Sequence, residues 1–190
     1  MGEAAKARAR NARDFFEFLE TLHPGAQAHL REALPSSVLG KVVGATSFDW
    51  NDVETVDGPY VTAIVGWLGD ERARTAWRVY GAKHFIRTPA VRALAEGAAR
   101  LFGLSVGSLV RMIPLAFKQG FRDCGEVKVE VGASEARVQL HLVESVAAHE
   151  AYAVMFHGLF LAIFDLVACE PSLVFSGDLR TGTLAATFRW

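Results

Sequence analysis

Histidine and cysteine are the residue types of this chain that could hold a metal ion, and their spacing argues against such a site. His149 and His157 lie eight residues apart in an apolar stretch, which places them about 12 Å apart along a helix axis at the usual rise per residue. Two imidazoles at that distance cannot share one ion. Cys124 and Cys169 are the two cysteines and make an incomplete ligand set. We therefore expect no metal site and no cofactor.

The residue types of a nucleophilic enzyme are present without a context that would activate them. The chain contains serine, histidine and aspartate but no Gly-x-Ser-x-Gly sequence or similar arrangement, so we expect no catalytic residues and no enzymatic activity. Asp165 is the acidic residue that needs an explanation, because it lies deep in an apolar stretch. A carboxylate there needs a partner such as arginine, or a place where the helix meets solvent.

The stretch that holds His157 and Asp165 is the one around which the chain is organised. Residues 147–169 carry apolar side chains on every side of a helix rather than on one stripe. A helix of that kind must be enclosed by other elements. We therefore predict a central, mostly buried helix over residues 151–166.

The segments on either side of this helix alternate apolar and polar residues, as half-buried strands do. Residues 127–131 read Val-Lys-Val-Glu-Val, and residues 138–142 and 183–190 alternate in the same way around turn-rich sequences. This pattern predicts two antiparallel hairpins, residues 126–143 and 172–190. We expect them to form one sheet with one polar face.

Helical patterns dominate the earlier part of the chain. Residues 38–58 are interrupted by glycines and acidic residues and predict a loop with at most one short extended piece. The periodicity elsewhere predicts five helices before the hairpins: residues 3–22, 26–34, 59–68, 71–86 and 90–102. A sixth, residues 105–121, contains Pro114, which should kink it or end it early.

Pro35 marks the predicted internal boundary. We expect residues 1–35 to form a helical extension and residues 36–190 to form one globular unit. The extension should begin in solvent, because its first residues are rich in alanine and in the basic side chains Lys6, Arg8, Arg10 and Arg13. The fold class is therefore α+β: a small antiparallel sheet of two hairpins separated by a buried central helix, packed with several N-terminal helices.

Composition bears on the compartment and on the binding partners that we expect for the protein. The 190 residues are 51% hydrophobic and 22% charged, which is typical of an ordered globular protein. A net charge of −1 gives no overall field that would attract nucleic acid. The longest apolar run is too short to span a bilayer, and two cysteines suit a reducing compartment. We expect a cytoplasmic protein that binds no nucleic acid and has no membrane span.

Several of these segments resemble a known family. The sequences VYGAKHFIRTP, RMIPLAFKQGF and the closing FRW, and in particular Gly81, Thr88, Pro114 and Trp190, resemble an uncharacterised domain family that is multiplied in myxobacteria. That family is grouped with the heme-nitric-oxide-binding, vinyl-reductase-type and TRAPP-subunit domains, and the resemblance covers roughly residues 38–190. Relatives in the superfamily enclose heme, bind aromatic effectors or acyl chains, or assemble into larger complexes.

The resemblance implies several kinds of ligand, and the residues of this chain argue against two of them, heme and zinc. Heme domains of this superfamily use a proximal histidine with a Tyr-x-Ser-x-Arg sequence for the propionates, and that sequence does not occur here. Zinc-bearing relatives of the vinyl-reductase type place several cysteines near the last hairpin, which has none in this chain. We therefore expect neither heme nor zinc.

Two functions fit these observations. The first is a non-enzymatic regulatory or sensor-like domain that binds an apolar or aromatic small molecule. The second is a protein–protein interaction or oligomerisation module, such as a homodimer, without a ligand. For the first, we predict a site between the central helix and the helix of residues 71–86, because their aromatic, imidazole and phenol groups could hold an apolar guest: Trp77, Tyr80, His84, Phe156, His157 and Phe160. The same side chains could instead pack directly on one another.

Overall fold

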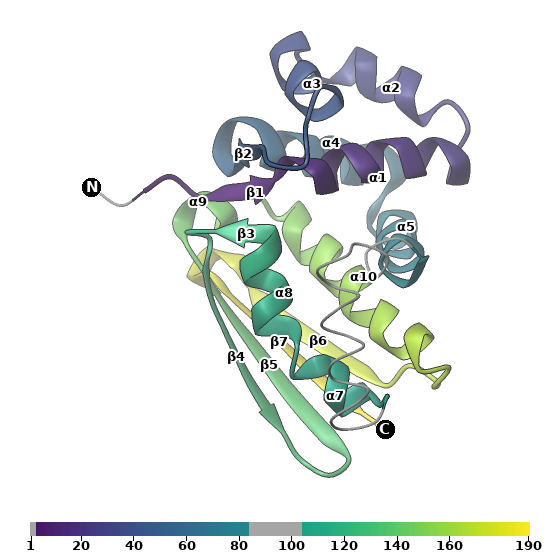
Figure 1. The fold of residues 1–190 in the computed structure, drawn as a ribbon, viewed down its shortest axis with the longest axis vertical. Coiled ribbons are helices and arrows are strands. Elements are labelled where there is room, and N and C mark those ends of the chain that lie inside the picture. The colour runs from purple at the N-terminus through teal and green to yellow at the C-terminus, as the bar shows by residue number, and fades with distance from the viewer. Residues whose placement is uncertain (1–2, 84–103) are drawn as a thin grey trace.

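A computed structural model describes residues 3–83 and 104–190. A four-stranded antiparallel sheet forms one side of the molecule, in the order β4-β5-β7-β6 (Figure 1). Its strands are β4 (Gly125–Val131), β5 (Glu135–Leu142), β6 (Leu173–Asp178) and β7 (Thr183–Arg189). The α+β class and the two hairpins in one sheet are therefore confirmed.

The register of this sheet explains why one of its faces is dry. Val138 lies opposite Val129 on one side and Ala186 on the other, and this row points towards the core. The neighbouring row contains Lys128 and Gln139, which belong to the polar face. Alternation along each strand therefore sorts the side chains, as the sequence pattern predicted.

Helix α10 (Ala151–Leu166) packs on the dry face of the sheet (Figure 1). Its Phe164 ring stacks on Phe188 of β7 with ring centroids 5.8 Å apart, and Phe160 lies 5.6 Å from the same ring. Nine of the helix residues are buried, on more than one side. The prediction of a central buried helix over these residues is confirmed.

Helix α5 (Asp70–Lys83) lies against α10 on the side away from the sheet. Glycines allow the two helices to approach closely. A Cβ atom on Gly158 would lie 2.5 Å from the carbonyl oxygen of Arg74, and one on Gly81 would lie 2.8 Å from the Cβ of Ala162. The two helices therefore come into close contact at Gly158 and Gly81, and neither position has space for a larger side chain.

The N-terminal residues form a second, smaller sheet. Strand β1 (Lys6–Arg8) pairs with β2 (Trp50–Asp52) and with β3 (Phe121–Arg122), in the order β2-β1-β3. The prediction of a solvated helical start at these residues is wrong. The partner strands lie far away in the sequence, and their pairing overrides the local helical preference of an alanine-rich segment.

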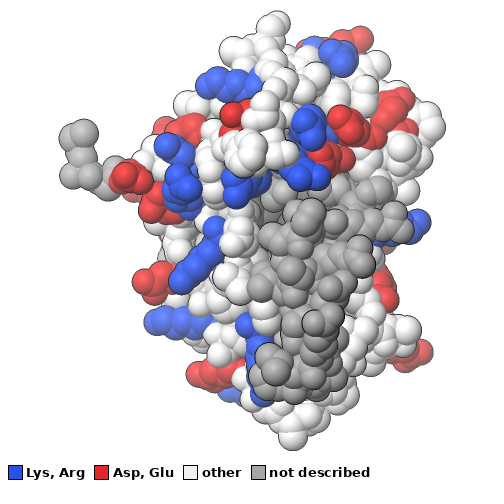
Figure 2. Space-filling view, viewed as in Figure 1, with Lys and Arg blue, Asp and Glu red and all other residues white. Residues whose placement is uncertain are grey.

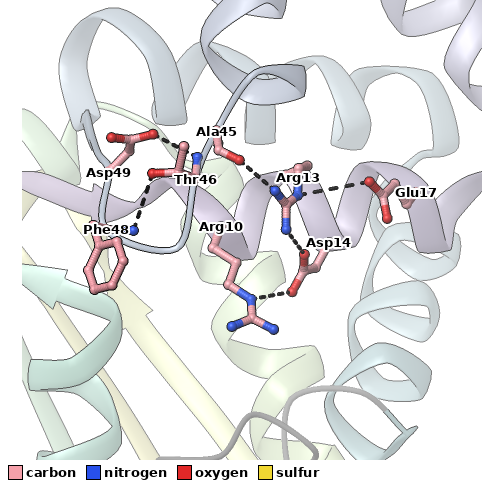
Figure 3. A network of polar contacts seen from close by, with 8 residues as sticks. All are labelled: Arg10, Arg13, Asp14, Glu17, Ala45, Thr46, Phe48 and Asp49. Atoms are coloured by element: carbon pink, nitrogen blue, oxygen red, sulfur yellow. Dashed lines mark hydrogen bonds and ion pairs between the residues drawn. The ribbon is translucent and has the colours of Figure 1, made fainter.

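Helix α1 (Ala9–Leu22) follows β1, and its basic residues are held by neighbours (Figure 3). Arg10 and Arg13 both contact Asp14, at 3.1 and 3.2 Å. Arg13 also donates a 2.6 Å hydrogen bond to the carbonyl of Ala45. These contacts fix the loop after residue 44 against α1.

The region predicted as a loop contains helical structure. Helices α2 (Ala26–Ala33) and α3 (Ser36–Val43) are followed, after β2, by the π-helical turn η1 (Val53–Asp57) and α4 (Gly58–Leu68). In α3 the buried residues Val38 and Val42 lie one turn apart, so burial stabilises a helix that contains a glycine. The loop prediction is therefore wrong over residues 38–43 and over η1.

The remaining helices also agree with the sequence where they are described. The pair α7 (Val106–Val110) and α8 (Ile113–Gly120) replaces a single long helix, and Pro114 stands in the first turn of α8. Short elements α9 (Glu144–Ala147) and η3 (Leu179–Thr181) complete the chain. The helix predicted over residues 90–102 lies outside the described residues.

Residues on both sides of the predicted boundary at Pro35 contribute to one hydrophobic core. Phe15 of α1 stacks on Trp77 of α5, with centroids 3.5 Å apart and planes 7° from parallel. Both side chains belong to the same buried cluster as the sheet and α10. The division into residues 1–35 and 36–190 stays a prediction.

The surface and the helices give no sign of a membrane-spanning segment in the described ranges. None of the helices there has both the length and the apolar character needed to cross a bilayer. On the face shown in Figure 2, basic and acidic side chains are interspersed. That distribution agrees with the small net charge.

Candidate functional site

A cavity of about 170 Å³ lies inside the helical layer. Its walls come from β1, β3, η1 and the helices α1, α4, α5, α7, α8 and α10, with Leu140 of the large sheet, and are largely apolar. Helix α10 contributes residues from Met155 to Leu166, which spans about 16 Å of helix axis at the standard rise. The cavity is therefore elongated along α10.

Four of the six residues predicted to hold a ligand line this cavity. Trp77 and Tyr80 reach it from α5, and Phe156 and Phe160 reach it from α10. All four are buried. The sequence periodicity thus placed these side chains on facing helix surfaces, while ligand binding by them stays a prediction.

Of the two histidines predicted to hold a ligand, the structure describes only His157. His157 is not among the lining residues described. Its ring stacks on Phe175 of β6 with centroids 4.7 Å apart, on the sheet side of α10. Burial and the charge of Arg74 lower the pKa of this imidazole. His84 lies outside the described residues.

One end of the cavity contains a buried carboxyl group. Asp57, the last residue of η1, lines the cavity and is 6% exposed. The hydroxyl of Tyr152 on α10 donates a 2.6 Å hydrogen bond to its Oδ2 atom. Burial raises the pKa of Asp57 to about 6, and the hydrogen bond from Tyr152 acts in the opposite direction.

The groups around this carboxyl keep their protons at neutral pH. Burial and the charge of Asp57 raise the pKa of both Tyr60 and Tyr152 well above the usual value. Tyr60 donates to the carbonyl of Ala12 at 3.1 Å. The Cys124 thiol donates to the carbonyl of Lys6 at 3.3 Å, and burial raises its pKa to about 12. A thiol with that pKa is a poor nucleophile.

A second polar atom lies in the wall of the cavity. The indole Nε1 of Trp77 is buried and has no hydrogen-bond partner within the described parts of the chain. A buried donor without an acceptor costs free energy. The Trp77 ring itself is held by its stack on Phe15, so the indole is a rigid part of the wall.

Sequence reasoning missed Asp57 and the residues of α8. Asp57 stands in an acidic segment that resembles an exposed loop, and nothing local indicates that Tyr152, 95 positions later, buries it. Met112, Ile113 and Phe117 also line the cavity. Their spacing predicted an apolar helix face but did not indicate what that face would contact.

A comparison with solved structures gives a match in fold. The fold is similar to that of a protein solved in work on modulating heme redox potential through protein-induced porphyrin distortion, with a TM-score of 0.58 and 13% identity. The match covers 96% of this chain and 99% of that chain. No model of a protein family and no curated protein matches the chain.

At this identity the likeness shows the fold alone. Membership in the myxobacterial family stays a prediction.

The cavity residues that the structure describes do not suit heme. Heme iron is commonly held by histidine, cysteinate or tyrosinate. The described lining contains neither histidine nor cysteine. Its tyrosines, Tyr60 and Tyr80, have raised pKa values because they are buried, which disfavours the phenolate form. In addition, the described residues contain no group of three or more histidine, cysteine or acidic side chains placed to hold a metal ion.

Proposed function

We propose that the protein is a non-enzymatic, sensor-like domain that binds one apolar or aromatic small molecule in the cavity along α10. The observation that carries this proposal is a largely apolar space bordered by Trp77, Tyr80, Phe156 and Phe160. Apolar cavities of similar volume take up apolar guests. A guest restores the dispersion contacts that the wall atoms otherwise lack.

The size of the cavity restricts the guest. A cavity of 170 Å³ is close to the ~150 Å³ of an engineered cavity that binds benzene, and lies below the ~300–1,000 Å³ of usual drug-sized sites. A single aromatic ring with a short substituent is therefore the expected class of ligand. The elongated shape favours a substituent placed along the axis of α10.

The position of the cavity supports a sensing role. Its walls include residues of the small sheet at β1, of the large sheet at Leu140, and of the helices between them. A guest contacts all of these elements at once. Ligand binding can therefore alter their relative stability, which is the requirement for coupling to another site.

The test uses a variant that fills the cavity. Ala116 lines the cavity from α8, and Ala116→Trp places an indole in that space. The control is Ala28→Trp on the exposed part of α2, which adds the same side chain at a distance. Binding of toluene, ethylbenzene and indole is measured by saturation-transfer NMR and by the shift in melting temperature.

The expected result is binding by the natural sequence and by Ala28→Trp, with loss of binding in a folded Ala116→Trp protein. Absence of binding of every compound to the natural sequence would overturn the proposal. Equal binding by Ala116→Trp and the control would place the guest elsewhere and would also overturn it.

An interaction or oligomerisation module is the alternative function, and one surface residue favours it. Phe48, in the loop before β2, is 86% exposed and stands near the small sheet (Figure 3). An exposed aromatic side chain can anchor a protein partner. Light scattering of the natural sequence and of Phe48→Ser would test this function: a dimer that dissociates in the variant supports it, and a monomer in both cases argues against it.

A further inference from the structure

Asp57 is an acceptor at one end of a largely apolar cavity, and its position bears on the kind of guest. Its Oδ2 atom accepts from Tyr152 at 2.6 Å. Its Oδ1 atom has no hydrogen-bond partner among the described residues. A carboxyl group offers about four acceptor positions in all, so the side chain retains capacity for another donor.

We propose that the guest carries a neutral hydrogen-bond donor, a hydroxyl or N–H group, which donates to Oδ1 of Asp57 while its apolar body lies along α10. This inference rests on the proposed function, because it names the chemical class of ligand for the same cavity. The rest of the lining is mostly aliphatic and aromatic, so the position of the donor fixes the orientation of the guest.

The preference arises from the cost of covering the Oδ1 acceptor with a guest that offers it no donor. A buried polar oxygen is nearly always hydrogen-bonded, and a bond to a charged acceptor is stronger than one between neutral groups. A donor in the guest supplies that bond at a residue that is only 6% exposed. A guest without a donor leaves the Oδ1 atom unpaired.

The surroundings of Asp57 also select against acidic guests. Tyr60 and Tyr152 remain neutral phenols, the Cys124 thiol remains protonated, and none of them offers a positive charge. His149, which packs over Gly58 and beside Tyr152, has its pKa lowered by burial. Arg8 lines the cavity too, but its guanidinium lies over the Trp50 ring, 4.3 Å from the centroid. A carboxylate placed beside Asp57 would therefore meet a like charge.

The experiment compares two isomers of which only one carries a hydrogen-bond donor. Benzyl alcohol has a hydroxyl donor, whereas anisole has the same atoms in an ether without a donor. Ethylbenzene, a hydrocarbon of similar shape, reports the cavity alone. Dissociation constants for all three are measured by NMR titration at pH 8, with the natural sequence, Asp57→Asn and Glu54→Gln. Glu54 lies in the same π-helical turn and is exposed, so its variant is the matched control.

In Asp57→Asn the amide oxygen can still accept from Tyr152, which leaves the amide NH₂ towards the guest. We expect the ratio of the anisole and benzyl alcohol dissociation constants to fall about tenfold in Asp57→Asn, the size of effect typical of a hydrogen bond to a charged group. Glu54→Gln should leave the ratio unchanged, and ethylbenzene should bind all three proteins within about twofold, as its contacts are with the apolar walls.

The outcomes separate the two proposals. If ethylbenzene binds all three proteins but the ratio is the same in Asp57→Asn, the donor inference is wrong and the proposed function stands. If none of the three compounds binds the natural sequence, the proposed function itself fails.

A second variant, Tyr152→Phe, is measured as well, because the asparagine could disturb the fold. This variant removes the donor to Oδ2 and leaves the carboxyl in place, so it should keep the preference for benzyl alcohol. Loss of the preference in Tyr152→Phe would contradict the inference.

Discussion

Arg78 on α5 holds Asp165 on α10 with two hydrogen bonds, from Nε at 2.7 Å and from Nη2 at 2.6 Å. The pair closes the interface of the two helices at the end opposite Asp57, where both side chains are about one third exposed. The sequence analysis expected either a partner such as arginine or a place where the helix meets solvent, and the structure shows an arginine partner at a partly exposed position. The bidentate geometry explains how an acidic residue is accommodated in an apolar helix.

The first prediction concerns this ion pair. Asp165→Ala should lower the free energy of unfolding by about 1 kcal/mol, because the pair is partly exposed and screened by solvent. A double-mutant cycle with Arg78→Ala, measured by urea unfolding, isolates the coupling. The pair of Arg137 and Glu135, which is more exposed at the arginine, is the comparison and should couple more weakly. Equal coupling in the two cycles would contradict the account.

The second prediction concerns the contact of α5 with α10. A Cβ atom at Gly158 would approach the backbone of Arg74 and the Cβ of Trp77, at 2.5 and 2.7 Å. Gly158→Ala should therefore separate the helices and destabilise the fold by about 1–3 kcal/mol. Gly66→Ala on α4 is the control, since a Cβ there meets no atom within 4 Å. That variant should stabilise the protein by about 0.5–1 kcal/mol through helix propensity.

Calorimetric melting of both glycine variants gives the comparison directly. A stabilised Gly158→Ala protein would show that the helices can separate without loss, and would contradict the close packing.

The third prediction concerns the aromatic wall of the cavity. Phe160 is 5% exposed and packs between Phe156 and Phe188. Phe160→Ala should cost about 3–5 kcal/mol, the usual loss for a core aromatic residue. Phe48→Ala removes the same side chain from an exposed position and should change stability by no more than about 0.5 kcal/mol. Chemical denaturation measures both, and a loss below about 1 kcal/mol for Phe160→Ala would mean that α10 is not the core helix.

The elements that the sequence predicted well are those with a strong local pattern. Residues 127–131 alternate strictly between apolar and polar side chains, as a strand with one buried face does. Residues 151–166 are apolar on all sides, as a buried helix is. The facing aromatic surfaces of α5 and α10 follow from the same periodicity. This is why Trp77, Tyr80, Phe156 and Phe160 could be placed near one another before their contacts were known.

The elements that it missed depend on distant partners. Strand β1 has three residues in an alanine-rich segment, and only its pairing with β2 and β3 makes it a strand. Asp57 is buried beside Tyr152, which lies 95 positions later in the sequence. A cavity is harder still to predict, since it is a property of how side chains from several elements fail to fill a space.

The last prediction concerns the pH dependence of stability, and it arises from Asp57. Burial raises the pKa of this carboxyl in the folded protein to about 6, from an ordinary value of 3.8. Between these two values the folded protein holds a proton that the unfolded chain has released. The folded state therefore binds more protons, and stability must fall as the pH rises through this window.

Asp57→Asn removes the titration while keeping a side chain of the same shape. The natural sequence should lose about 2–3 kcal/mol of unfolding free energy relative to this variant between pH 4 and pH 7, since each unit of pKa shift is worth about 1.4 kcal/mol. Urea unfolding at half-unit steps of pH measures both proteins, and groups that titrate in each of them cancel in the difference. Well below pH 3.8 the two curves should run parallel, because Asp57 is then neutral in both states. A constant difference from pH 4 to pH 7 would mean that the Asp57 carboxyl ionises as easily in the folded protein as in water, and it would remove the argument that the cavity ends in a desolvated acceptor.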